Sequence, residues 1–223
     1  MTASRIAVLD FDSTLFDVNS FVTALSQAVE AEFGIDAQAF AAQINQHYVR
    51  DETGEGIGYD VQAHLRQHGH DPADQTVQDR LVHRILAIHH LRTGEPDLMF
   101  PDARRFVQRL IADPHTKTAI LTVNLEFGFW FKQRLCSPQL DAISARVIAT
   151  NKGLMLAGEW ATAITYDHHP YDTALVVDDS PAQIEAVPSR PSIRRVQIVR
   201  PGHRYPQTTD PSIEIVRTLD DVQ

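Results

Sequence analysis

Short, continuous runs of apolar residues occur once near the start of the chain and repeatedly in its second half. They lie at residues 5–9, 118–123, 145–149, 174–178 and 195–199. Runs of this length, rich in Val and Ile and without polar alternation, are typical of strands buried on both faces of a parallel sheet. Helical patterns separate them, and two of these begin at Pro101-Asp102 and Ser180-Pro181. Strands that alternate with helices predict an α/β fold with a doubly wound parallel sheet.

Residues 17–97 interrupt this alternation, because they contain amphipathic helical patterns and no strand signal. The first pattern places apolar side chains on one helical face: Phe21, Leu25, Ala28, Val29 and Phe33. The sequence therefore predicts an all-helical insertion after the first strand, large enough to have a core of its own. We expect a Rossmann-like core formed by residues 1–16 and 98–223, and a separate helical domain formed by residues 17–97.

Composition excludes several classes of protein. No apolar run approaches the roughly 18–20 residues of a membrane span, and Asp10 and Asp12 interrupt the only apolar stretch near the N-terminus. The formal charge of −9 disfavours nonspecific binding of nucleic acid. Cys136 is the only cysteine, so we expect neither an internal disulfide nor a cysteine-rich zinc site. We therefore expect a cytoplasmic protein with no membrane partner, and no obligate protein partner is evident.

Polar residues follow four of the predicted strands. They are Asp10-Phe11-Asp12-Ser13-Thr14, Thr122-Val123-Asn124, Asn151-Lys152-Gly153 and Asp178-Asp179-Ser180. Ligands of such sheets gather at the carboxyl ends of the strands, so these groups should converge. Crowded carboxylates repel one another unless a cation intervenes, and a hard cation with oxygen ligands and retained waters fits Mg²⁺. A hydroxyl and an ammonium group beside it can hold phosphoryl oxygens, which indicates phosphoryl transfer.

Each of these motifs also has a structural explanation when taken alone. An Asp pair after an apolar run is often a helix cap, and a single lysine is usually a solvated surface charge. Their order along the chain favours the functional interpretation, since all four fall at the ends of successive predicted strands.

The same residues resemble the four motifs of the haloacid dehalogenase superfamily. The resemblance is carried by Asp10-Phe11-Asp12-Ser13-Thr14-Leu15, Thr122, Lys152 and Asp178-Asp179, with VVDDSPAQIEAV at 176–187 and MFPDARRFVQRL at 99–110 as flanking matches. It covers nearly the whole chain, because residues 17–97 lie where the family carries its helical, C1-type cap. Lys152 is the weakest match, and it remains the best amine because Lys117 precedes the second strand and Lys132 follows it.

The resemblance implies a two-step phosphatase mechanism. Asp10 would attack phosphorus and form an aspartyl-phosphate, and Asp12 would act as general acid and then general base. Mg²⁺ would bind Asp10, the backbone carbonyl of Asp12 and Asp178, with Asp179 as a further ligand or a support for the others. Thr122 and Lys152 would bind the phosphoryl oxygens, assisted by backbone N–H groups of the next residues, Val123 and Asn124.

Two branches of the superfamily fit the sequence less well. Dehalogenases lack the second aspartate of the first motif, which is present here as Asp12. Phosphonatases need a lysine in the cap, and no lysine precedes Lys117. The favoured function is hydrolysis of a phosphomonoester of a small metabolite, either a sugar phosphate or a nucleotide. A phosphomutase, a polynucleotide-end phosphatase and a catalytically inactive binding protein on the same core remain alternatives.

Three further features leave their roles open. A basic segment contains Arg190, Arg194, Arg195, Arg200, His203 and Arg204, which are either surface arginines or contacts to a larger phosphorylated partner. The glycine-containing loop at 53–58 is either a flexible connector or a specificity element acting through Glu55. His64 and His68 are spaced to bind zinc from one helical face, but solvated surface histidines are favoured because no cysteine or H-E-x-x-H pattern supports them.

Overall fold

The computed structural model describes residues 4–50, 56–149, 152–157, 171–202 and 205–223. The chain forms two compact units. The first comprises residues 1–16, 99–122 and 138–223, and the second comprises residues 17–98 and 123–137. Residues 123–137 thus join the second unit, whereas the division expected from the sequence assigned all of 98–223 to the core.

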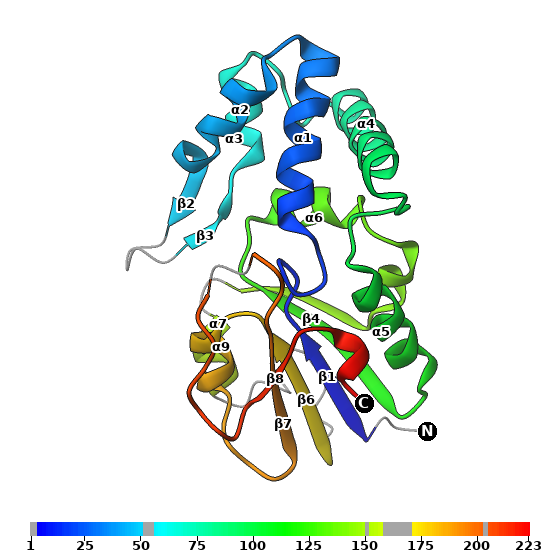
Figure 1. Cartoon of the computed structure of the whole chain (residues 1–223), viewed down its shortest axis with the longest axis vertical. Coiled ribbons are helices and arrows are strands. Elements are labelled where there is room, and N and C mark those ends of the chain that lie inside the picture. Colours follow the sequence, from blue (N-terminus) through cyan, green and yellow to red (C-terminus); the bar gives the residue numbers. More distant parts are fainter. Residues whose placement is uncertain (1–3, 51–55, 150–151, 158–170, 203–204) are drawn as a thin grey trace. The chain divides into compact units, whose positions relative to one another are not determined.

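The first unit is built on a six-stranded sheet in the order β5-β4-β1-β6-β7-β8 (Figure 1). All neighbouring strands run parallel. The strands are β1 (Arg5–Leu9), β4 (Thr116–Thr122), β5 (Ala145–Ile148), β6 (Thr173–Asp178), β7 (Ile193–Ile198) and β8 (Glu214–Val216). The predicted α/β fold is therefore confirmed, and each predicted strand is present. The short edge strand β8 was not anticipated, because its three residues carry too little pattern.

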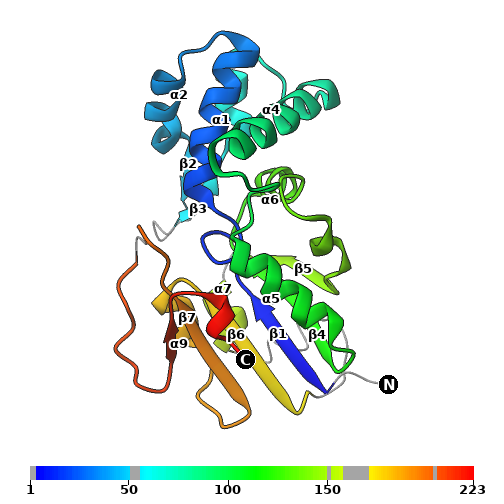
Figure 2. The same ribbon diagram turned by 45° about the vertical axis from the view of Figure 1, so that its right-hand side comes forward.

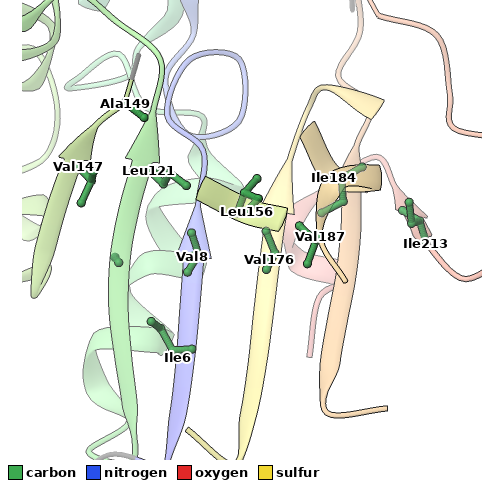
Figure 3. Packing of buried hydrophobic residues seen from close by; sticks show 11 residues of the cluster. Ile6, Val8, Leu121, Val147, Ala149, Leu156, Val176, Ile184, Val187 and Ile213 are labelled. Carbon is green, nitrogen blue, oxygen red and sulfur yellow. The ribbon is translucent and has the colours of Figure 1, made fainter. Parts of the chain in front are cut away.

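Helices lie on both faces of this sheet. The helices are α5 (Pro101–Ala112), α7 (Lys152–Ala157) and α9 (Pro181–Ala186), with 3₁₀ helices η2 (Pro138–Ala142) and η3 (Leu219–Asp221). Helices α5 and α9 begin at the expected prolines. One core cluster lies between the strands and helices α7 and α9, with α5 behind the sheet (Figure 3). Its labelled members are Ile6, Val8, Leu121, Val147, Ala149, Leu156, Val176, Ile184, Val187 and Ile213.

The apolar runs of the sequence explain this arrangement. Alternate residues of a strand point to opposite faces, so Ile6 and Val8 enter the cluster while Ala7 and Leu9 are buried on the other side. Mostly apolar runs are favoured because both faces of the sheet are covered, and the polar Arg195 and Gln197 of β7 are buried with hydrogen-bond partners.

The second unit is mostly helical. Its elements are α1 (Val18–Phe33), α2 (Ala37–Gln43), 3₁₀ helix η1 (Ile44–His47), β2 (Tyr48–Arg50), β3 (Gly56–Tyr59), α3 (Val61–Gln67), α4 (Gln75–Thr93) and α6 (Glu126–Gln133). Helices α1 and α4 lie side by side in both views (Figures 1 and 2). The predicted apolar face of α1 is buried at Phe21, Leu25, Ala28 and Val29. Gly34 ends α1 with a left-handed φ of 70°, which glycine adopts without steric cost.

The prediction of an all-helical insertion is wrong in one respect, because β2 and β3 form a two-stranded antiparallel sheet. Sequence periodicity missed it since each strand has only three or four residues. Gly56 leaves room for the ring of Tyr48 on the other strand: a Cβ at position 56 would lie 2.5 Å from its Cε1, so the ring would have to move. Glu55 and residues 53–54 of the predicted loop lie outside the described residues, whereas Gly56 and Gly58 belong to β3.

No helix in the described part of the chain combines the length and apolar character needed to cross a membrane.

Candidate active site

The ends of three adjacent strands bring the predicted site residues to one edge of the sheet. Strand β1 lies between β4 and β6, and Leu9 is in register with Val177. Asp10 follows β1 directly, and its backbone N–H donates to the carbonyl of Val177 at 2.9 Å. Asp178 is the last residue of β6, and Thr122 is the last residue of β4. Parallel strands end at the same edge, so the sequence order of the motifs becomes proximity in space.

Three carboxylates are gathered there. Ligand oxygens of Asp10, Asp178 and Asp179 all lie within 4.8 Å of one another, and the three residues are buried. They are the only group of three or more His, Cys, Asp or Glu residues in the described ranges with this geometry. Asp178 Oδ1 also accepts a hydrogen bond from the backbone N–H of Ser180 at 2.9 Å. Asp12 is half-buried and is not a member of this group.

Lys152 is the counterion of this cluster. It is the first residue of α7 and only 3% exposed. Its Nζ lies 2.7 Å from Asp10 Oδ1 and 2.5 Å from Asp178 Oδ2. The structure therefore brings Lys152 into direct contact with Asp10 and Asp178, two other site residues expected from the sequence.

Burial and charge act in opposite directions on the pKa values of this pair. Burial raises the pKa of Asp10 above its ordinary value, Lys152 lowers it, and Asp178 raises it further, so the result is a raised pKa. Burial lowers the pKa of Lys152, but Asp10 and Asp178 more than compensate and leave it above its ordinary value. The ammonium group therefore stays charged at neutral pH.

The donor set fits a hard divalent cation. Three buried carboxylates face one ammonium group, which leaves an excess of negative charge that burial makes costly. Carboxylate oxygens are the ligands that Mg²⁺ uses in proteins. The residues that could hold the ion are Asp10, Asp178 and Asp179.

Buried polar contacts hold the backbone of Asp179 in place. The side chain of Gln197, the next-to-last residue of β7, is fully buried and donates to the carbonyl of Asp179 at 3.1 Å. Its Oε1 accepts from the backbone N–H of Thr208 at 2.8 Å. A polar side chain in a central strand is costly unless it is satisfied in this way. Gln197 was not anticipated, and a lone glutamine within an apolar run was the available signal.

Val123 and Asn124 are assigned to the second unit, although they follow Thr122 in sequence. Asn124 is buried, and its Oδ1 accepts from the backbone N–H of Leu125 at 3.0 Å. The assignment of Thr122, Val123 and Asn124 to phosphate binding stays a prediction.

Most of the described basic segment is occupied by internal contacts. Arg195 is buried and hydrogen-bonds Asp210 and the carbonyl of Val187. Arg194 pairs with Glu214, with Nη2 2.7 Å from Oε2. Arg200 is buried against Asp102. The interpretation of this segment as surface arginines is therefore wrong for Arg195 and Arg200, while His203 and Arg204 lie outside the described residues.

The histidines of the second unit also differ from the expectation of solvated rings. His64 is fully buried, stacks on Phe40 with ring centroids 3.8 Å apart, and meets the hydroxyl of Tyr59 at 2.7 Å. Burial, and next the charge of His47, lowers the pKa of His64 to about 4. His64 is a neutral core residue of this unit.

Comparison with known proteins adds the fold relationship. No protein-family model and no curated protein matches the sequence significantly. Among solved structures, a haloacid dehalogenase-like hydrolase from Burkholderia xenovorans is 19% identical, with a TM-score of 0.59 over 98% of this chain and 94% of that one. This chain has the haloacid dehalogenase fold.

Two further structures with this fold belong to proteins with different descriptions. A HAD hydrolase from Bacillus subtilis, whose structure is bound to magnesium, is 10% identical, with a TM-score of 0.54 over 98% of this chain and 96% of that one. A dehalogenase solved as an intermediate complex is 16% identical, with a TM-score of 0.52 over 99% and 96%. The haloacid dehalogenase fold therefore serves both a magnesium-bound hydrolase and a dehalogenase among these neighbours.

Proposed function

We propose that this chain is a Mg²⁺-dependent phosphatase of the haloacid dehalogenase superfamily, and that its second unit is the cap domain. The observation that carries the proposal is the buried cluster in which Lys152 pairs with Asp10 and Asp178 beside Asp179. A cluster with more carboxylates than cations fits a reaction that brings a divalent cation and a phosphoryl group together. The motif resemblance and the fold both support the superfamily assignment.

Asp10 is the proposed nucleophile. A carboxylate oxygen of Asp10 attacks phosphorus in line, a bond from oxygen to phosphorus forms, and the bond from phosphorus to the substrate oxygen breaks. Its salt bridge to Lys152 keeps the attacking carboxylate ionised and oriented, in spite of the burial that raises its pKa. When bound, Mg²⁺ would neutralise phosphoryl oxygens and reduce their repulsion of the nucleophile.

Asp12 is the proposed proton carrier. It gives its proton to the departing substrate oxygen, then removes a proton from the water that attacks the aspartyl-phosphate, and phosphate leaves. Thr122 and Lys152 hold phosphoryl oxygens while this charge is redistributed. A general acid is needed because an alkoxide is a poor leaving group, whereas a halide leaves without a proton. Asp12 therefore favours phosphatase over dehalogenase activity.

The proposed substrate is a small phosphorylated metabolite, a sugar phosphate or a nucleotide, and the proposed compartment is the cytoplasm. The internal ion pairs of Arg194, Arg195 and Arg200 remove much of the reason for proposing a polynucleotide end.

Phosphate release from an aryl phosphate and from a panel of sugar phosphates and nucleotides tests the proposal. We expect turnover with Mg²⁺, loss of turnover with chelator, and a loss of roughly 10³-fold or more in Asp10→Asn. Asp172→Asn, an exposed aspartate of the same unit, is the matched control. Halide release from 2-haloacids is measured in parallel. Halide release without phosphate release would contradict the phosphatase assignment, and inertness in both assays would favour a mutase or a binding protein.

A further inference from the structure

The turn that carries Asp12 has an unfavourable backbone conformation. Ser13 has a φ of 63°, and it is the only non-glycine residue in the described ranges with a positive φ. The turn closes on itself, since the N–H of Ser13 donates to the carbonyl of Phe16 and the N–H groups of Leu15 and Phe16 donate to the carbonyl of Phe11. A left-handed non-glycine residue persists only where surrounding contacts hold it.

One of these contacts comes from a distant part of the chain. Arg200, two residues beyond β7, donates from Nη2 to the carbonyl of Thr14 at 2.8 Å. Thr14 is fully buried and Arg200 is 8% exposed. The guanidinium group also lies 4.0 Å from the ring centroid of Phe100. The planar guanidinium group of Arg200 is thus held against the turn at Thr14, two residues after Asp12.

Asp102, in the first turn of α5, fixes the orientation of Arg200. Arg200 Nη1 lies 2.8 Å from Asp102 Oδ1 and 2.7 Å from Oδ2. Asp102 Oδ2 also accepts from the N–H of Leu219 at 2.7 Å and from the hydroxyl of Thr218 at 3.0 Å. Burial would raise the pKa of Asp102, but these donors hold it below its ordinary value. The Asp102 carboxylate is therefore charged. It links α5 to Arg200 and to the segment Thr218–Leu219.

We propose that Arg200, oriented by Asp102, is a positioning residue for Asp12. It fixes the Phe11–Phe16 turn so that Asp12 reaches the oxygen of the leaving group, and it does not itself contact substrate. The inference rests on the proposed function, because it assigns Asp12 the proton-transfer role. A purely structural ion pair is the alternative, and it predicts an equal loss of activity with every substrate.

The sequence provides a matched control in Arg195. It lies on β7, is 4% exposed, and pairs with Asp210 with Nη2 3.1 Å from Oδ2. Its hydrogen-bond partners Val187, Asp210 and Ser212 lie outside the Phe11–Phe16 turn. Arg195→Lys therefore measures the effect of disturbing a buried arginine of the same unit without disturbing the turn.

The test compares Arg200→Lys, Arg200→Met and Asp102→Asn with wild type and Arg195→Lys on a series of phosphate esters with leaving groups of increasing pKa. General-acid catalysis is worth about 10²- to 10⁴-fold, and it matters most when the leaving group is poor. We expect kcat/KM of the Arg200 variants, which reports the steps up to formation of the aspartyl-phosphate and therefore the general-acid role of Asp12, to fall at most about threefold for a nitrophenyl phosphate and about 100-fold or more for an alkyl phosphate. Arg195→Lys should show no such dependence of kcat/KM on the leaving group. A loss that is equal for all leaving groups overturns the proposal.

Amide hydrogen exchange of the peptide spanning residues 10–17 separates this inference from the proposed function. We expect the exchange of Ser13, Leu15 and Phe16 to accelerate at least tenfold in the Arg200 variants and to stay unchanged in Arg195→Lys. Unchanged exchange in the Arg200 variants overturns the positioning role. If wild type hydrolyses no phosphate ester but exchange accelerates as expected, the phosphatase assignment fails and the role of Arg200 in holding the turn stands. Arg200→Lys retains the charge and provides the test if Arg200→Met does not fold.

Discussion

Replacing Lys152 with methionine should make the stability of this protein depend on a divalent cation. The Nζ of Lys152 lies 2.7 Å from Asp10 Oδ1 and 2.5 Å from Asp178 Oδ2, and the lysine is 3% exposed. Methionine has a similar unbranched length, so the substitution removes the charge while it keeps most of the apolar packing. The carboxylates of Asp10 and Asp178 then lose this buried counterion.

The size of the effect follows from the burial of the pair. Removing one partner of a buried ion pair costs about 3–5 kcal/mol, because the other charge is left uncompensated. For a protein of this size, about 1 kcal/mol shifts Tm by roughly 2–4 °C, so chelator-treated Lys152→Met should melt about 6–20 °C below wild type. Burial raises the pKa of Asp10, and without Lys152 the folded protein should hold this proton still more tightly than the unfolded chain does. The deficit should therefore shrink as the pH falls.

Added Mg²⁺ should reverse much of this loss. Each tenfold rise in ion concentration above Kd stabilises the folded state by about 1.4 kcal/mol. The ion should bind Lys152→Met more tightly than wild type, because the competing ammonium charge is gone.

Thermal unfolding in chelator and in increasing Mg²⁺ provides the assay, with Lys132→Met as the matched control. Lys132 is also buried, at 4% exposure, but lies on α6 in the second unit. Its variant should lose stability without a larger response to Mg²⁺ than wild type shows. If Lys152→Met melts within about 2 °C of wild type in chelator, less than about 1 kcal/mol was lost and the electrostatic reasoning is refuted. Equal Mg²⁺ responses in the two variants would refute the assignment of the cluster to a cation.

Two further predictions concern buried polar side chains. The pKa of His64 is lowered to about 4 by burial and by His47, whereas the unfolded chain binds this proton near pH 6.5. Stability present above pH 6.5 should therefore be lost as the pH falls to about 4, by up to about 3 kcal/mol. Urea unfolding at pH 7 and pH 4.5 measures this, and His64→Gln should show a smaller difference; an unchanged difference would contradict the role of His64. Gln197→Met should leave the carbonyl of Asp179 and the N–H of Thr208 without this partner, at a cost of about 1–3 kcal/mol for each buried group. Calorimetric titration should show weaker Mg²⁺ binding in Gln197→Met, and wild-type affinity would contradict a role in placing Asp179.

The fold of the first unit could be predicted because its strands are buried on both faces. Such strands are mostly apolar, so each is visible as a local run in the sequence. The convergence of Asp10 and Asp178 followed from the same pattern, since adjacent parallel strands end at one edge of the sheet. The position of Lys152 could not be predicted from a local pattern, because α7 has only six residues and little periodicity. Only the tertiary structure shows that its Nζ lies beside the carboxylates of both Asp10 and Asp178.

The sequence by itself therefore determined the α/β sheet and the set of acidic residues at its edge, because both are consequences of local periodicity and strand direction. Tertiary structure alone decided which polar residues are buried. Arg200 and Asp102 are separated by 98 positions, and the same arginine would be a surface residue if no carboxylate met it. The β2–β3 pairing and the burial of His64 also depend on neighbours that the local pattern does not specify. A buried charge or ring is stable only when its partners are in place, and partners distant in sequence are brought together by packing.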